Sequence, residues 1–107
     1  MKEFVDLRSD TVTRPGIEMR QAMNYADVGD DVIGEDPTVN KLERTVAEML
    51  GMEDGLFVAS GTQSNLLALF SHCERGDEYI AGQSSHSYLE EGGGGAILAS
   101  LQPQPYQ

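Results

Sequence analysis

The sequence is poor in basic residues and in cysteine, and both scarcities narrow the range of functions. Seven lysines and arginines stand against 18 aspartates and glutamates in 107 residues, which gives a formal net charge of −11. A nucleic-acid or anionic-membrane surface needs clustered Lys and Arg, so neither partner is expected. The single cysteine, Cys73, can form no internal disulfide and no thiolate metal cluster. Its place in an apolar run indicates core packing, and a reducing, cytoplasmic compartment is expected.

Several patterns with well-defined chemistry are also missing. No apolar run approaches the roughly 20 residues of a membrane-spanning helix, and no charged-then-apolar leader is visible. Neither G-x-x-x-x-G-K-[ST] nor G-x-G-x-x-G occurs, which argues against a P-loop or a dinucleotide site. The acidic loop 27–36 does not fit an EF-hand, because Gly29 or Val32 stands at a ligand position. His72 and His86 lack metal-ligand spacing, so no metal site is predicted.

Short helical and extended segments alternate along the chain. The opening segment EFVDLRSDTVTRP has extended character and is interpreted as an arm. Apolar spacing and capping residues predict helices over 15–26, 37–50 and about 61–75, and short strands over 56–59, 78–82 and 96–101. Between the last two strands, residues 83–91 are expected to form a loop or one helical turn. This alternation predicts an α/β fold with parallel strands, in which ligands bind at the carboxyl ends of strands.

The stretch VASGTQSNLLALF, residues 58–70, changes from a strand pattern to a helix pattern at Ser60-Gly61-Thr62. A helix beginning at Gly61 or Thr62 leaves backbone N–H groups unpaired and favours an anion there. Glycine would let a phosphate approach the main chain, and the hydroxyls of Thr62 and Ser64 could add donors. The alternative is that Ser60 or Thr62 only caps the helix. The local sequence leaves both interpretations open.

Two histidines and a glycine run are further candidates. His72 falls in the last turn of a predicted helix, where it would favour the helix dipole in a structural role. His86 instead follows a predicted strand, in a polar segment. The run Gly92–Gly95 is either a flexible hinge or a close approach of the backbone to a neighbour, and the hinge is the simpler interpretation.

Four segments together carry a family resemblance: DLRSDTVTRP, GDDVIGEDPTVNKLE, ASGTQSNLLAL and HSYLEEGGG. In this order and spacing, over nearly the whole chain, they resemble the N-terminal part of low-specificity threonine aldolases, which belong to the fold-type-I pyridoxal-phosphate enzymes. The resemblance implies an N-terminal arm over residues 1–15. It implies that residues 16–107 form the N-terminal part of the large cofactor-binding domain, with a partial three-layer sheet.

The resemblance also implies roles for individual residues. Gly61, Thr62 and Gln63 would hold the phosphate of pyridoxal 5′-phosphate. His86 would stack on the pyridine ring and is the candidate catalytic residue, because it could influence proton transfer from the substrate hydroxyl. Stacking is the preferred interpretation, since a base must reach that hydroxyl. Ser9 would help to bind the substrate carboxylate.

For the intact protein, the resemblance implies reversible cleavage of threonine, allo-threonine and related β-hydroxy-α-amino acids to glycine and an aldehyde. A homo-oligomer, a dimer or tetramer with shared active sites, is implied as well. The family's Schiff-base lysine has no match, because Lys2 and Lys41 are the only lysines and neither lies in a matching motif. The chain is therefore expected to be an inactive fragment. Ile33 stands where many relatives carry tyrosine.

Two other functions stay open. Another fold-type-I enzyme, such as a β-eliminating lyase or an aminotransferase, would share the phosphate corner but should lack the DLRSDTVTRP arm beside GDDVIGEDP. A non-catalytic acidic α/β fragment is the second alternative. It would be excluded by a reading frame that continues into a lysine after a short Ser/Thr-rich strand.

Overall fold

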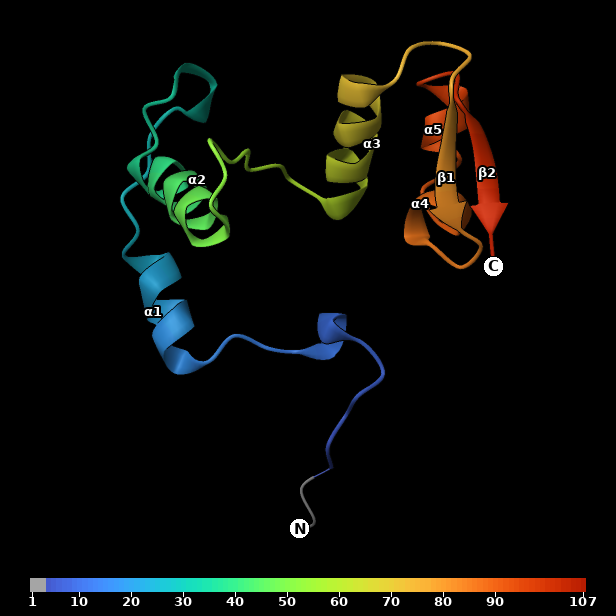
Figure 1. The fold of residues 1–107 in the computed structure, drawn as a ribbon. Helices are drawn as coiled ribbons and strands as arrows, with labels where there is room; N and C mark the ends of the chain where they lie inside the picture. The colour runs from blue at the N-terminus through green and yellow to red at the C-terminus, as the bar shows by residue number, and fades with distance from the viewer. Residues whose placement is uncertain (1–3) are drawn as a thin grey trace. The chain divides into compact units, whose positions relative to one another are not determined.

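The computed structural model describes residues 4–107 (Figure 1). The chain divides into two units, of which the first ends at Gly55 and the second begins at Leu56. The first unit holds two 3₁₀ turns and two helices: η1 (Asp10–Val12), α1 (Ile17–Asn24), η2 (Asp31–Ile33) and α2 (Pro37–Leu50). The second holds α3 (Gly61–His72), β1 (Glu78–Gly82), α4 (His86–Leu89), α5 (Gly94–Ile97) and β2 (Gln102–Tyr106).

Helix α2 begins and ends where the sequence predicted. The Oδ1 atom of Asp36 accepts hydrogen bonds from the backbone N–H groups of Thr38 and Val39, at 2.9 Å each. Pro37 occupies the first helical position, where its missing N–H costs nothing. At the other end Gly51 adopts a left-handed conformation, with φ of 67°, and ends the helix.

The acidic loop before α2 folds back onto the start of that helix. The second oxygen of Asp36 accepts the Gly29 N–H at 3.0 Å, and Thr38 donates its hydroxyl to the carbonyl of Asp27 at 2.6 Å. A side chain at Gly29 would place its Cβ 2.2 Å from the carbonyl oxygen of Glu35, so only glycine fits. Asp36 is buried. The loop therefore has a structural role.

The other two predicted helices are present and shorter than expected. Helix α1 starts at Ile17, and α3 ends at His72 because Cys73 is extended, with φ of −128° and ψ of 150°. The strand predicted over 56–59 is wrong, since the structure assigns no strand there. A strand requires a hydrogen-bonded neighbour, and within residues 4–107 only β1 and β2 pair with each other.

The strand predicted over 96–101 is also wrong. Residues Gly94–Ile97 form α5, and Ser100 takes a left-handed conformation with φ of 57°. The strand is the next segment, β2, which pairs in parallel with β1, so that Glu78 lies opposite Gln102. A short apolar run fits a buried helical turn as well as a strand, which explains the error. The strand predicted over 78–82 is confirmed as β1, and α4 is the helical turn expected within 83–91.

Two prolines lie within β2. Gln102 donates its N–H to the carbonyl of Asp77, and the carbonyl of Tyr106 accepts the Gln83 N–H, both at 2.9 Å. Because strand residues alternate in direction, the intervening Pro103 and Pro105 have their nitrogens on the side away from β1. Proline is tolerated there, since no ladder hydrogen bond is lost.

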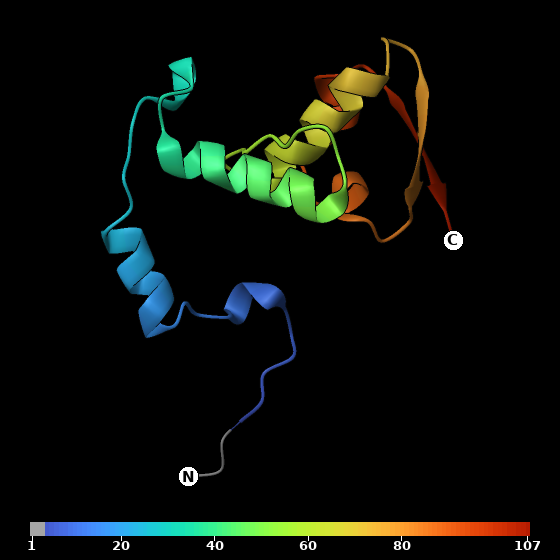
Figure 2. The ribbon, with the colours of Figure 1, turned by 60° about the vertical axis from the view of Figure 1, so that its left-hand side comes forward.

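Helices cover one face of the two-stranded sheet in the second unit. Figures 1 and 2 both show α3, α4 and α5 on the same side of β1 and β2. Burial alternates along β1 accordingly: Tyr79 and Ala81 face the helices, whereas Ile80 is 82% exposed. This arrangement is the α/β fold with parallel pairing that the sequence predicted. Among residues 4–107, no helix is long and apolar enough to cross a membrane.

Candidate functional site

The first turn of α3 is closed by reciprocal capping. The hydroxyl of Ser60 accepts the Gln63 N–H at 3.2 Å, and the side-chain Oε1 of Gln63 accepts the Ala59 N–H at 3.2 Å. This pattern is close to a capping box, in which the side chains of a Ser and of a Gln three residues later each accept a backbone N–H group at the start of the helix. The capping interpretation is therefore right for Ser60. Within this turn Gln63 already uses its amide oxygen and its N–H. A contact between Gln63 and a phosphate stays a prediction.

Three donors at this corner are left over. Among residues 4–107, the N–H groups of Gly61 and Thr62 and the Thr62 hydroxyl have no hydrogen-bond partner. An ideal Cβ built on Gly61 would meet nothing within 4 Å, so the backbone there is open to an approaching group. Helix N-termini also carry a partial positive charge. The corner can therefore accept an anion with backbone and hydroxyl donors.

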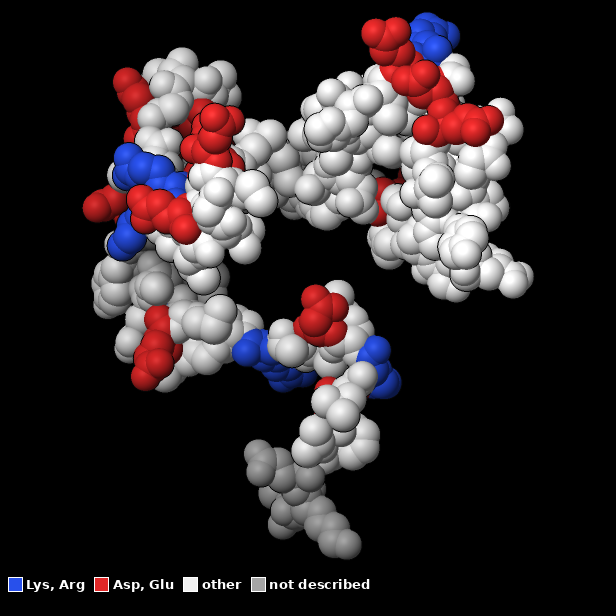
Figure 3. Space-filling view, viewed as in Figure 1, with Lys and Arg blue, Asp and Glu red and all other residues white. Residues whose placement is uncertain are grey.

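The segment that forms this corner and α3 carries no acidic residue of its own. Residues 56–72 contain no aspartate or glutamate. Figure 3 shows charged side chains gathered at the turn between α3 and β1, where Glu74, Arg75, Asp77 and Glu78 lie, and an uncharged surface over most of the visible face of α3. The acidic side chain known to lie near the start of α3 is Glu91, and its carboxylate is already paired with Asn65 and His86.

His86 begins α4 and is held by one side-chain hydrogen bond. Its Nδ1 lies 2.9 Å from Oε1 of Glu91. The His86 side chain is 67% exposed, whereas that of Glu91 is only 6% exposed. The imidazole ring therefore projects into open space from a nearly buried carboxylate anchor.

The same carboxylate oxygen connects His86 to α3. The Nδ2 atom of Asn65 donates to Oε1 of Glu91 at 2.6 Å. Asn65 follows Thr62 by three residues, which puts the two on the same face of the helix. The hydrogen bond from His86, more than that from Asn65, lowers the pKa of Glu91 below its ordinary value and keeps it ionised. The structure thus brings His86 beside the first turns of α3.

The sequence interpretation missed Glu91 and Asn65. Both lie within segments that carried the family resemblance, yet neither showed a motif of its own. Glu91 is five residues from His86 and 26 from Asn65. Only the packing of α4 against α3 brings them together, and one sequence gives no signal for such a contact.

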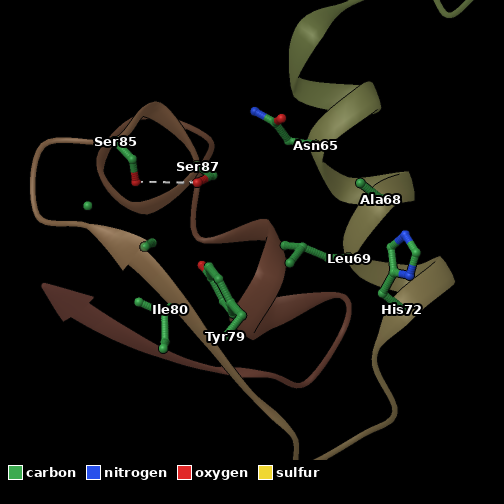
Figure 4. A pocket seen from close by; sticks show the side chains of 10 residues that line it. Asn65, Ala68, Leu69, His72, Tyr79, Ile80, Ser85 and Ser87 are labelled. Atoms are coloured by element: carbon green, nitrogen blue, oxygen red, sulfur yellow. Dashed lines mark hydrogen bonds between the residues drawn. The ribbon is translucent and has the colours of Figure 1, made fainter. Parts of the chain in front are cut away.

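A groove of about 440 Å³ lies between α3 and β1 (Figure 4). In this view Asn65 and His72 project from α3, and Tyr79 lies between that helix and β1, with Leu69 extending toward its ring. Ser87 lines the end where α4 begins. His72 stands in the last turn of α3, as predicted, and belongs to this groove.

Ser9 lies in the first unit, in extended backbone before η1. Its Oγ accepts the Thr11 N–H at 3.2 Å and lies 2.8 Å from the Thr11 hydroxyl, so it caps η1. This capping role is enough to explain a serine at this position, even if no ligand binds there. Substrate binding by Ser9 stays a prediction. Ile33 is 66% exposed in η2, Lys41 lies in α2, and Lys2 lies outside the described residues.

The described residues offer no group of three or more His, Cys, Asp or Glu side chains arranged to hold a metal ion.

Comparison with known proteins connects these features to a family. The family model described as beta-eliminating lyase matches residues 6–107. The low-specificity L-threonine aldolase of Escherichia coli strain K12 is 61% identical over 102 residues, which is 95% of this chain and 31% of that protein. The probable low-specificity L-threonine aldolase 2 of Arabidopsis thaliana is 52% identical over 94% of this chain and 28% of its own length. Alanine racemase TOXG of Cochliobolus carbonum is 39% identical over 95% of this chain and 26% of its own length. The chain thus spans about a third or less of these relatives.

Proposed function

The chain belongs to the beta-eliminating lyase family, and on that premise we propose that it forms the N-terminal part of a pyridoxal-phosphate-dependent threonine aldolase. In this proposal residues 1–15 are an arm and residues 16–107 are part of the large cofactor-binding domain. The protein that carries this segment cleaves threonine and allo-threonine reversibly to glycine and acetaldehyde. It acts in the cytoplasm as a homo-oligomer.

One observation carries the proposal: the donors of Gly61 and Thr62 that could bind an anion lie on α3, the helix that is connected to His86 by the hydrogen bonds of Asn65 and Glu91. The donors of Gly61 and Thr62 fit a phosphate group, and the open space at Gly61 fits its approach to the main chain. The exposed imidazole of His86 fits a planar aromatic ring. Asn65 and Glu91 hold that imidazole beside the helix. The residues present therefore fit pyridoxal phosphate.

Each of these residues would contribute a distinct interaction. The backbone and hydroxyl donors of Gly61 and Thr62 would bind the phosphate oxygens, and the helix terminus would stabilise their charge. When bound, pyridoxal phosphate supplies the electron sink for cleavage of the bond beside the substrate amine. His86 would cover one face of the ring.

His86 has one ring atom free for proton exchange. Its Nδ1 is engaged by Glu91, so Nε2 is the atom that could exchange a proton with the substrate hydroxyl. Ser9, on the arm, would bind the substrate carboxylate in a neighbouring subunit's site.

The phosphate corner can be tested on the 107-residue chain by equilibrium dialysis with pyridoxine 5′-phosphate, which carries an alcohol in place of the aldehyde and cannot react with lysine. We expect binding that inorganic phosphate competes away. Thr62→Val should weaken it by about 1–3 kcal/mol, or roughly 5- to 150-fold, because a phosphate oxygen loses a donor. Thr45→Val is the matched control, since the Thr45 hydroxyl donates within α2, to Lys41. Equal affinity of the two variants would contradict a phosphate seat at Thr62.

The reaction requires the longer protein that carries this segment. Incubation with pyridoxal phosphate and threonine should release acetaldehyde and glycine, and His86→Ala should lower both cofactor retention and turnover, whereas His86→Phe keeps much of the retention. The 107-residue chain alone should release none above a cofactor-only control, because neither lysine lies in a matching motif. Alanine racemisation is followed in the same samples. Racemisation without threonine cleavage would overturn the aldolase assignment.

A further inference from the structure

We propose that Glu91 is a positioning residue that fixes the His86 tautomer and, through Asn65, couples the orientation of His86 to the start of α3. The hydrogen bonds that carry this inference exist in the chain without any ligand. Its meaning for cofactor binding rests on the proposed function.

The direction of both hydrogen bonds follows from the chemistry of Glu91. An ionised carboxylate only accepts hydrogen bonds, so the Asn65 amide and the His86 Nδ1 must both be donors to Oε1. Neutral His86 therefore carries its proton on Nδ1 and leaves the Nε2 lone pair facing outward. The Glu91 side chain is 6% exposed, so water has little access to replace either donor.

The hydrogen bond to Glu91 provides the specific orientation of the ring. The His86 side chain is 67% exposed, which means that packing does little to restrict it. Helix α4 is only four residues long, and Ser85 makes no side-chain cap hydrogen bond to it. Without Glu91, nothing described around His86 would select one tautomer or one ring plane.

Asn65 gives this anchor a fixed relation to the phosphate corner. Helix α3 is continuous from Gly61 to His72, so Asn65 cannot shift without moving the first turn that carries Thr62. Because Oε1 of Glu91 is hydrogen-bonded to both Asn65 and His86, a shift of that turn should also move His86. A ligand at the start of α3 should therefore be sensed at His86, and the amide of Asn65 should be needed for this.

The tautomer can be measured in the ligand-free chain by magic-angle-spinning NMR with ¹⁵N-labelled histidine, which does not require a monodisperse sample. We expect His86 to be predominantly protonated on Nδ1 in its neutral form, with His72 as the internal reference. Glu91→Ala should shift His86 toward the Nε2-protonated form that a solvated histidine side chain favours. Glu91→Gln should restore the Nδ1 form, because its amide oxygen can still accept.

Glu90→Gln is the matched control, since Glu90 is exposed and its substitution removes the same charge one residue away. It should leave the His86 tautomer unchanged. A predominantly Nε2-protonated His86 in the unaltered chain would overturn the inference. So would a Glu91→Gln variant that behaves like Glu91→Ala, because the acceptor would then not be what fixes the ring.

Coupling is tested by adding inorganic phosphate, which has no ring to contact His86, to the same samples and comparing the unaltered chain with Asn65→Ala. We expect the ligand to shift the His86 signals in the unaltered chain, and Asn65→Ala to reduce that shift several-fold at matched occupancy. An undiminished shift would overturn the coupling. If no phosphate binds while His86 keeps its Nδ1 proton, the proposed function fails and the positioning role of Glu91 stands.

Discussion

At the scale of single residues, the ionisation of Glu91 links the candidate site to stability. Its folded pKa is lowered from the ordinary value of 4.5, chiefly by the His86 hydrogen bond. A lowered pKa means that the ionised form stabilises the folded state. This contribution is fully present above the unfolded pKa and is lost as the pH falls through the lower folded pKa.

The corresponding prediction concerns Glu91→Gln, which cannot titrate. The unaltered chain should exceed this variant in free energy of unfolding by about 0.5–1 kcal/mol near neutral pH, a magnitude typical of the net contribution of one hydrogen bond. The difference should shrink on acidification below 4.5. Urea unfolding across pH measures it, with Glu90→Gln as the control for loss of an exposed charge. A difference that does not change on acidification would contradict the prediction.

Single residues also show where sequence reasoning stops. The sequence alone was enough to predict Ser60 as a cap and the open donors of Thr62, because each depends on neighbours within one helical turn. The role of Glu91 could not be predicted from the sequence, because its partner Asn65 is 26 positions away. Ser9 illustrates a second limit: the family resemblance implied a substrate contact there, and the structure shows that the Ser9 hydroxyl already caps η1.

At the scale of elements, the glycine run shows how a backbone can pack closely against its neighbours. Gly92 and Gly93 have left-handed φ values of 63° and 69° and lead into α5. Gly95 is buried, and a Cβ there would lie 3.0 Å from the Tyr79 hydroxyl oxygen and 3.2 Å from Cδ1 of Leu69. Close approach, the alternative to a hinge, is therefore what the structure shows at Gly95.

Gly95→Ala is predicted to lower the free energy of unfolding by about 1–3 kcal/mol, because it overpacks the contact between α5, α3 and β1. Gly94→Ala is the matched control: its Cβ would meet Leu66 at an ordinary 3.6 Å, and alanine favours a helix. Urea unfolding of both variants gives the comparison. Tyr79→Phe in the Gly95→Ala background should recover part of the loss. Equal stability of the two alanine variants would rule out the close contact.

Elements with local signals at both ends were predicted best. Helix α2 has Asp36 and Pro37 at its start and Gly51 at its end, and the structure places it there. The segments 56–59 and 96–101 had only apolar character, and neither forms a strand. Strand β2 was missed: it contains Pro103 and Pro105, which are uncommon in strands, and its parallel partner β1 is distant in sequence. Strand identity depends on pairing, which a local pattern does not contain.

At the scale of the whole molecule, large apolar side chains remain exposed. The buried hydrophobic residues among those described are three alanines and one leucine: Ala47, Ala81, Ala99 and Leu101. No large side chain in residues 4–107 is fully buried, while Leu56 is 74% exposed and Ile97 is 72% exposed. Burial of apolar area is the main favourable term in folding, so a chain that buries so little gains little stability from it.

We therefore predict that the isolated chain self-associates and unfolds over a broad, low-temperature transition. The uncovered face of β1 is the main expected contact, because Ile80 is 82% exposed on a strand that a second copy can pack against. Ile80→Lys should shift sedimentation toward monomer at matched concentration. Val32→Lys, at a site that is 92% exposed within the short turn η2, should change it much less. A concentration-independent monomer with a sharp, high-temperature transition would show that these exposed side chains drive no association.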